Sequence, residues 1–188
     1  CAICGASEEM APADAVLYAL RDATATVDSV PLICGSILSK KLAEGIVGLV
    51  LDVKCGAGAV FSDFDDADTL GRALVESGTS SGLPTVALVT DMDAPLGMAV
   101  GNAIEVAEAI DCLRGYGPAD LRELSVQIVA RMLVAGGVSD DLEKSVARAV
   151  AALDAGAGLE RFEMMLIAQG GDPRVVSEPG RLGQIGRA

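Results

Sequence analysis

The chain has 188 residues, and its 27 acidic against 14 basic side chains give a net charge of −13, which excludes the positive field that attracts nucleic acid or an anionic membrane surface. Its longest apolar stretches, 94–104 and 45–51, are far shorter than the roughly 18 to 20 residues that cross a bilayer. It contains no His, the commonest general base, so its chemistry must use Lys, Arg, Ser, Thr or carboxylates. We therefore expect a soluble, cytoplasmic protein without nucleic-acid or membrane partners.

The five cysteines are odd in number and irregularly spaced: Cys1, Cys4, Cys34, Cys55 and Cys112. This pattern favours buried thiols in a reducing compartment over a disulfide framework. Cys1 and Cys4 have CxxC spacing, but no second CxxC and no His completes a metal site. We interpret them as part of a strand of small apolar residues; the alternative is a metal or redox site.

Two helices are predicted before the first strand. Residues 14–22 carry apolar side chains at helical spacing. The second helix is capped by Asp28 or Ser29, has Pro31 in its first turn, where a missing N–H is harmless, and stops at Gly45.

A parallel βαβ unit follows these helices. The apolar runs 48–53 and 85–90 are typical of buried strands, and residues 67–78 between them have a helical pattern. A strand, a helix and a strand in this order pair as parallel strands. The fold class is therefore α/β.

Beyond Asp91 the pattern is helical. Four segments carry apolar residues three and four apart, at 101–113, 119–135, 140–153 and 158–168. Residues 170–188 show no apolar periodicity.

The domain organisation follows from these elements. We expect an α/β segment at 1–91, of which 12–45 belongs to a helical domain, and a helical bundle segment at 92–168. Residues 169–188 are expected to be a linker toward a C-terminal part outside this chain.

Two polar residues stand on the second helix among apolar neighbours. Ser36 and Lys40 are four residues apart and project from one helix face, where they can bond neighbouring acceptors of a planar ligand such as a pyrimidine. Arg21, at the end of the first helix, can supply a forked donor to the same oxygens. In the alternative interpretation Lys40 is a solvated helix end, Ser36 a packing residue, and Arg21 an ion-pair partner of Asp14 or Asp22.

The ends of the two strands carry further polar residues. Lys54 precedes a Gly-Ala-Gly loop at 56–58, where a lysine and backbone amides can meet an anion; an ion pair with Asp52 is the alternative. Asp91 and Asp93 end the second strand, but two carboxylates without further ligands are a weak signal for a divalent cation.

Several long motifs stand in a fixed order along the chain. They are LYALRDATATVDS at 17–29, PLI at 31–33, SILSKK at 36–41, LVLDVK at 49–54, TDM at 90–92, PLG at 95–97, GNAIEV at 101–106 and QGGDP at 169–173. In content, order and spacing these motifs closely resemble the thymidine and pyrimidine-nucleoside phosphorylase family. The resemblance covers nearly the whole chain.

The resemblance implies a nucleoside phosphorylase/phosphoribosyltransferase-like fold and a cytoplasmic homodimer of pyrimidine nucleoside salvage. Such enzymes are transferases that reversibly convert thymidine, or in broader members uridine, and inorganic phosphate into thymine or uracil and a pentose 1-phosphate, without a cofactor. By the same resemblance Arg21 and Lys40 are the catalytic cations that hold the base carbonyls, and Ser36 bonds the ring edge. The residues that border the base are then Tyr18, Val27, Ile33 and Val60.

The resemblance also implies a monovalent cation, K⁺, held by the carbonyls of Leu96 and Ala99 and the carboxylate of Glu108. The family's Lys-His-Ser-Thr-Gly-Gly stretch, which binds phosphate, is missing, so we assign no phosphate-binding residue to this segment and expect the chain alone to be inactive. Ala6 replaces a glutamine and Val60 an aromatic residue of the family, which alters pocket shape or strand packing.

Two alternatives stay open. The first is a truncated relative that acts as a non-catalytic binding or assembly module. The second is a phosphorylase of nucleoside monophosphates, which needs a second phosphate pocket.

Overall fold

The computed structural model describes residues 2, 3, 5 and 9–183; Cys1, Cys4 and Ala6, and the expectations placed on them, lie outside the described residues. The chain forms two compact units. Of the described residues, the α/β unit contains 5, 9–94 and 131–140, and the helical unit contains 2, 3, 95–130 and 141–183.

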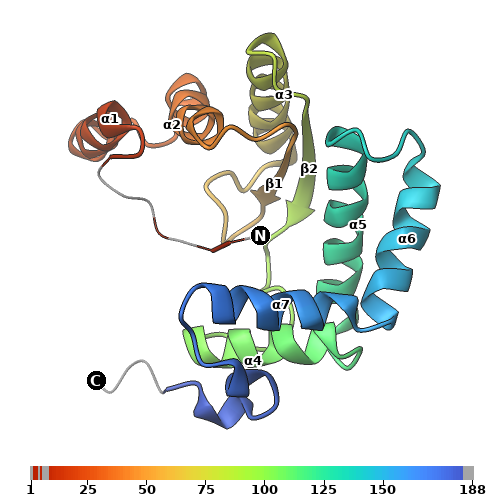
Figure 1. Ribbon diagram of the computed structural model, residues 1–188. Coiled ribbons are helices and arrows are strands. Elements are labelled where there is room, and N and C mark those ends of the chain that lie inside the picture. Colours follow the sequence, from red (N-terminus) through yellow and green to blue (C-terminus); the bar gives the residue numbers. More distant parts are fainter. Residues whose placement is uncertain (1, 4, 6–8, 184–188) are drawn as a thin grey trace. The chain divides into compact units, whose positions relative to one another are not determined.

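The α/β unit contains the predicted helices and the predicted βαβ element (Figure 1). Its elements are α1 (Pro12–Ala23), α2 (Val30–Ala43), β1 (Leu49–Cys55), α3 (Phe64–Ser80) and β2 (Thr85–Asp91). The strands pair in parallel, from Leu49 opposite Thr85 to Cys55 opposite Asp91. Helix α3 packs against both strands, α2 packs against α3, and α1 packs against α2.

Local signals explain where these helices begin and end. The carboxylate of Asp63 accepts a hydrogen bond from the amide of Asp65 at 2.8 Å and caps α3. Helix α2 begins after Ser29 as predicted, although the Ser29 side chain makes no capping bond. Gly45, with φ of 68°, turns the chain into the left-handed region after α2.

Both strands are longer than their apolar runs. We predicted strands at 48–53 and 85–90, but the ladder continues through Lys54 opposite Thr90 and Cys55 opposite Asp91. The apolar pattern ends earlier because the last strand residues are polar and half-buried or exposed. Backbone pairing, rather than burial of a side chain, extends these strands.

The core of the α/β unit lies between α2, α3 and the sheet. Its buried residues are Cys34, Leu38, Leu49, Val53, Ala67, Leu70, Leu74 and Leu83. Burial raises the pKa of the thiols of Cys34 and Cys112, which are both free, so they stay protonated at neutral pH. The expectation of buried thiols is confirmed for these two cysteines and is wrong for Cys55, which is half-buried at the end of β1.

The helical unit contains the four predicted helices and two short 3₁₀-helices. Its elements are α4 (Asn102–Leu113), α5 (Ala119–Ala135), α6 (Leu142–Asp154), α7 (Ala157–Ala168), η1 (Pro173–Val176) and η2 (Pro179–Arg181). Residues 131–135 of α5 group with the α/β unit. Helix α7 packs against α4, α6 and η1.

The segment that we expected to be a linker contains ordered structure at its start. Val175 and Val176 are buried, and the guanidinium of Arg114 donates a hydrogen bond to the carbonyl of Val176. Two apolar residues anchor this segment. Two residues are too few to produce a detectable periodicity in the sequence. Across the described part of the chain, the helices are too short or too polar to pass through a bilayer.

We predict that Leu74→Ala lowers the free energy of unfolding by about 2 to 5 kcal/mol, because Leu74 is only 1% exposed and the substitution leaves a cavity in the core. Leu20→Ala, at a helix position that is 54% exposed, is the matched control and should change it by much less. Chemical denaturation of both variants measures the difference. Equal losses would contradict the assigned core.

Candidate functional site

A cavity of about 330 Å³ lies within the α/β unit, a size typical of small-molecule pockets. Helices α1 and α2 with the loop between them, strand β1, the loop after β1 and helix α3 supply its lining. Six of the seven residues predicted to form a base site line it: Tyr18, Arg21, Val27, Ile33, Ser36 and Val60. The seventh, Lys40, does not line the cavity but contacts Ser36.

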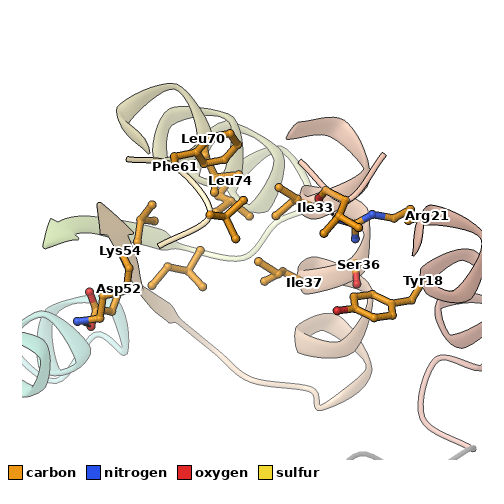
Figure 2. Close-up of a pocket in the computed structure, with 14 residues that line it drawn as sticks. Tyr18, Arg21, Ile33, Ser36, Ile37, Asp52, Lys54, Phe61, Leu70 and Leu74 are labelled. Carbon is orange, nitrogen blue, oxygen red and sulfur yellow. Dashed lines mark hydrogen bonds and ion pairs between the residues drawn. The ribbon is translucent and has the colours of Figure 1, made fainter. Parts of the chain in front are cut away.

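Figure 2 shows that the polar groups stand at two ends of this cavity. Tyr18, Arg21 and Ser36 gather on the side of α1 and α2. Asp52 and Lys54 lie together at the β1 end. Apolar side chains cover much of the remaining wall, among them Ile37, Phe61, Leu70 and Leu74. The arrangement suits a flat, mainly apolar ligand with polar atoms on its edge.

Arg21 is a buried cation, 6% exposed, in the last turn of α1. Its guanidinium donates to the carbonyl of Val27 and, at 3.4 Å, to that of Thr26, and it lies 5.5 Å from the centre of the Tyr18 ring. These contacts fix the side chain by a cation–π interaction and by backbone acceptors. A guanidinium carries five N–H donors, so further donors remain for a ligand.

Lys40 is paired within the protein rather than solvated at the helix end. Its ammonium donates to the carboxylate of Asp14 at 2.5 Å and to the hydroxyl of Ser36 at 3.1 Å. We considered Arg21 as a partner for Asp14, but Asp14 pairs with Lys40 instead. The Asp14 side chain is 13% exposed and the Lys40 side chain 30%, so both charges are partly removed from water.

The ionisation of Asp14 reflects these contacts. Burial by itself raises the pKa of this carboxyl, but hydrogen bonds from Lys40 and Ser36 and the positive charges of Lys40 and Arg21 outweigh it. The pKa of Asp14 therefore lies below its ordinary value of 3.8, and the group is ionised at neutral pH.

Lys54 forms a second polar cluster at the ends of the strands. Its ammonium lies 2.7 Å from the Asp52 carboxylate and donates to the Thr90 hydroxyl at 3.0 Å, while Thr90 donates to Asp52. The ion pair that we considered as the alternative for Lys54 is therefore formed. Each member of the cluster is half-buried and satisfied by the other two.

The backbone amides of the loop after β1 already donate hydrogen bonds within the protein. Gly56 donates to the carbonyl of Phe61 at 3.2 Å, Gly58 to that of Met92 at 3.0 Å, and Ala57 to the carboxylate of Asp93 at 2.8 Å. The interpretation in which these amides bind an anion therefore lacks support, because each amide already has an acceptor. Gly56 is required here, since its φ is 134° and a Cβ would lie 2.7 Å from the amide nitrogen of Asp93.

The two carboxylates at the end of β2, Asp91 and Asp93, also accept hydrogen bonds from backbone amides. Asp91 accepts from the amide of Asp93 at 2.8 Å, and Asp93 accepts from Ala57. No group of three or more His, Cys, Asp or Glu residues that could hold a metal ion occurs among the described residues. The divalent cation considered for Asp91 and Asp93 therefore lacks support in the described part of the chain.

The residues predicted to hold a monovalent cation lie in the helical unit. The Glu108 carboxylate accepts hydrogen bonds from the amides of Met98 at 2.8 Å and Ala99 at 3.0 Å. It lies against Gly97, where a Cβ would be 2.3 Å from its second oxygen. Glu108 thus closes the loop that contains Leu96 and Ala99, and the cation itself stays a prediction.

Asp14 and Thr90 contact charged residues of the site, and the sequence analysis gave neither of them a role there. Asp14 was considered only as a partner of Arg21, although it is four residues before Tyr18 and seven before Arg21, which is the spacing of one helix face. Thr90 was not assigned at all, and its position opposite Lys54 depends on the register of the strands.

Comparison with known proteins relates this arrangement to a family. Residues 1–159 match the a/b domain of the glycosyl transferase family. Pyrimidine-nucleoside phosphorylases of Staphylococcus aureus strains bovine RF122 / ET3-1 and USA300 are each 46% identical to the chain over 183 residues. These matches cover 97% of the chain and 42% of each relative, so the chain spans less than half of the length of these relatives.

We predict that Asp14 titrates below 3.8 and that Lys40→Met raises its pKa, because burial then acts with less compensation. Since the folded pKa is the lower one, ionised Asp14 contributes stability that is complete above its unfolded pKa and is lost as pH falls through its folded pKa. NMR titration of the carboxyl carbon measures both values. Lys41→Met is the control, because Lys41 pairs with Glu44 at 2.8 Å instead. An unchanged Asp14 titration in Lys40→Met would contradict the pairing.

Proposed function

This chain belongs to the glycosyl transferase family, and from that premise we propose that it contains the base-binding part of a pyrimidine-nucleoside phosphorylase. The observation that carries the proposal is the convergence of the buried Arg21 and the hydroxyl of Ser36 on one side of an apolar cavity. A pyrimidine has flat apolar faces and a polar edge, which is the complement of this wall. The identity to the S. aureus phosphorylases supports the same assignment.

The proposed reaction is the reversible phosphorolysis of thymidine or uridine. Phosphate attacks C1′ of the sugar, and the glycosidic bond breaks with both electrons leaving on the base. The base anion takes up the proton that hydrogen phosphate gives up, so the products are a pentose 1-phosphate and thymine or uracil. Negative charge grows on the base while the sugar becomes oxocarbenium-like. Cations fixed at the base therefore stabilise the transition state more than the substrate.

Arg21 and Lys40 have different places in this proposal. Arg21 lines the cavity and can donate directly to a carbonyl oxygen of the base. Lys40 does not line the cavity, but its ammonium contacts the Ser36 hydroxyl, which does. The positive charge of Lys40 therefore lies close to the polar edge of the base. The apolar walls exclude water from this end and strengthen both interactions.

Arg21, Ser36 and Lys40 are proposed to bind the base and not the phosphate. The chain contains no His, so the family's Lys-His-Ser-Thr-Gly-Gly stretch is absent from it. The proposal extends to a cytoplasmic homodimer in nucleoside salvage and to K⁺ at the loop closed by Glu108. These extensions rest on the family resemblance.

We predict that Arg21→Ala and Lys40→Ala, in the complete protein, each lower kcat/KM for thymidine phosphorolysis by on the order of a hundredfold or more, since each removes a cation from a developing anion. Ser36→Ala should lose less. The control is Lys41→Ala, which removes the adjacent lysine that pairs with exposed Glu44 and should keep the wild-type rate. Folded Arg21 and Lys40 variants with wild-type rates would refute the base site.

We predict that the 188-residue chain alone releases no thymine from thymidine and phosphate, because nothing in its surface of net charge −13 replaces the missing phosphate-binding stretch. Chromatography of the incubation mixture measures free thymine, with one of the S. aureus enzymes as the positive control. A turnover of about one per second, ordinary for an enzyme, would contradict this expectation.

A further inference from the structure

We propose that Asp14 is a positioning residue of the base site, which holds the Lys40 ammonium against the Ser36 hydroxyl at the polar end of the cavity. This inference rests on the proposed function, since it concerns the same cavity. It adds Asp14 to the residues of that site. Asp14 does not touch the base, and it acts through Lys40 and Ser36.

Two helix faces meet to build this arrangement. Asp14 shares one face of α1 with Tyr18 and Arg21, at spacings of four and seven residues. Ser36 and Lys40 share one face of α2, and the two helices pack against each other. The contact joins residues 26 apart in the chain, so only the packing of α1 on α2 creates it.

The donors and acceptors of the trio limit how its protons are placed. Lys40 has three N–H donors, of which one points to Asp14 and one to Ser36. The ammonium is therefore held between a carboxylate on α1 and a hydroxyl on α2. Asp14 supplies the charged contact of the two, so it fixes the position of the ammonium.

This arrangement has a consequence for the ligand. Ser36 lines the cavity, and the Lys40 ammonium stands directly behind its hydroxyl. Without Asp14 the ammonium can turn away from Ser36 toward water, since the Lys40 side chain is 30% exposed. The base then loses a fixed positive charge at its polar edge.

An ion pair at the end of α2 serves as a comparison, because it has no contact with the cavity wall. Lys41 and Glu44 are 2.8 Å apart, with side chains 37% and 31% exposed, and neither lines the cavity. Asp14, at 13% exposed, is more buried and contacts a residue of the cavity wall through its partner. Glu44→Gln is therefore a matched control for Asp14→Asn.

The test compares Asp14→Asn, Asp14→Glu and Glu44→Gln with wild type in the complete protein. The measurements are kcat and KM for thymidine, the inhibition constant for uracil, and the unfolding temperature. We expect Asp14→Asn to lower kcat/KM by about tenfold to a hundredfold. Asp14→Glu should restore part of this loss, and Glu44→Gln should leave kcat/KM unchanged.

The outcomes separate a positioning role from a structural one. A folded Asp14→Asn variant that keeps the wild-type kcat/KM would overturn the inference, since a structural role changes stability alone. If Asp14→Asn does not fold, the Asp14→Asn/Lys40→Met variant removes both charges and is compared with Lys40→Met alone. Because Asp14 acts through Lys40, the two variants should have the same kcat/KM, and a further tenfold loss in the double variant would overturn the inference.

The same experiment distinguishes this inference from the proposed function. Wild-type protein that neither cleaves thymidine nor binds uracil refutes the proposed function, and the inference with it. Active wild-type protein with unaffected Asp14 variants refutes the role of Asp14 alone.

Discussion

The ion pair between Asp14 and Lys40 joins the two helices that supply the polar end of the cavity. Each charge is partly withdrawn from water, and this cost is offset only because the partners hold each other and Ser36 completes their hydrogen bonding. The same helix contact brings Arg21 toward the cavity. The geometry of the candidate site therefore depends on how α1 packs on α2.

The βαβ element provides the rigid wall opposite this polar end. Leu70 and Leu74 of α3 and Val53 of β1 belong both to the buried core and to the lining of the cavity. A wall shared with the core cannot shift without disturbing close packing, so the cavity inherits its shape from the fold. An apolar wall also raises the strength of the electrostatic contacts at its edge.

The polar groups at the strand ends form hydrogen bonds and an ion pair with one another, so few of their donors are left to bind a ligand. Lys54, Asp52 and Thr90 bond one another across the parallel pair, and the amides at 56–58 already have acceptors. The donors left for a ligand are thus those of the helices, above all Arg21. This asymmetry is the physical reason to place the polar edge of a base at the end formed by α1 and α2.

Sequence alone determined the order of helices and strands, the parallel βαβ element and six residues of the cavity wall, because periodicity, caps and glycine positions are local signals and each phosphorylase motif is a short, continuous run of residues. It did not show that Lys40 stands behind Ser36, that Asp14 is its partner or that the amides at 56–58 are occupied. Only the tertiary structure decided these points. They depend on contacts between residues distant in the chain, and a pattern within one helix or strand contains no information about what that element packs against.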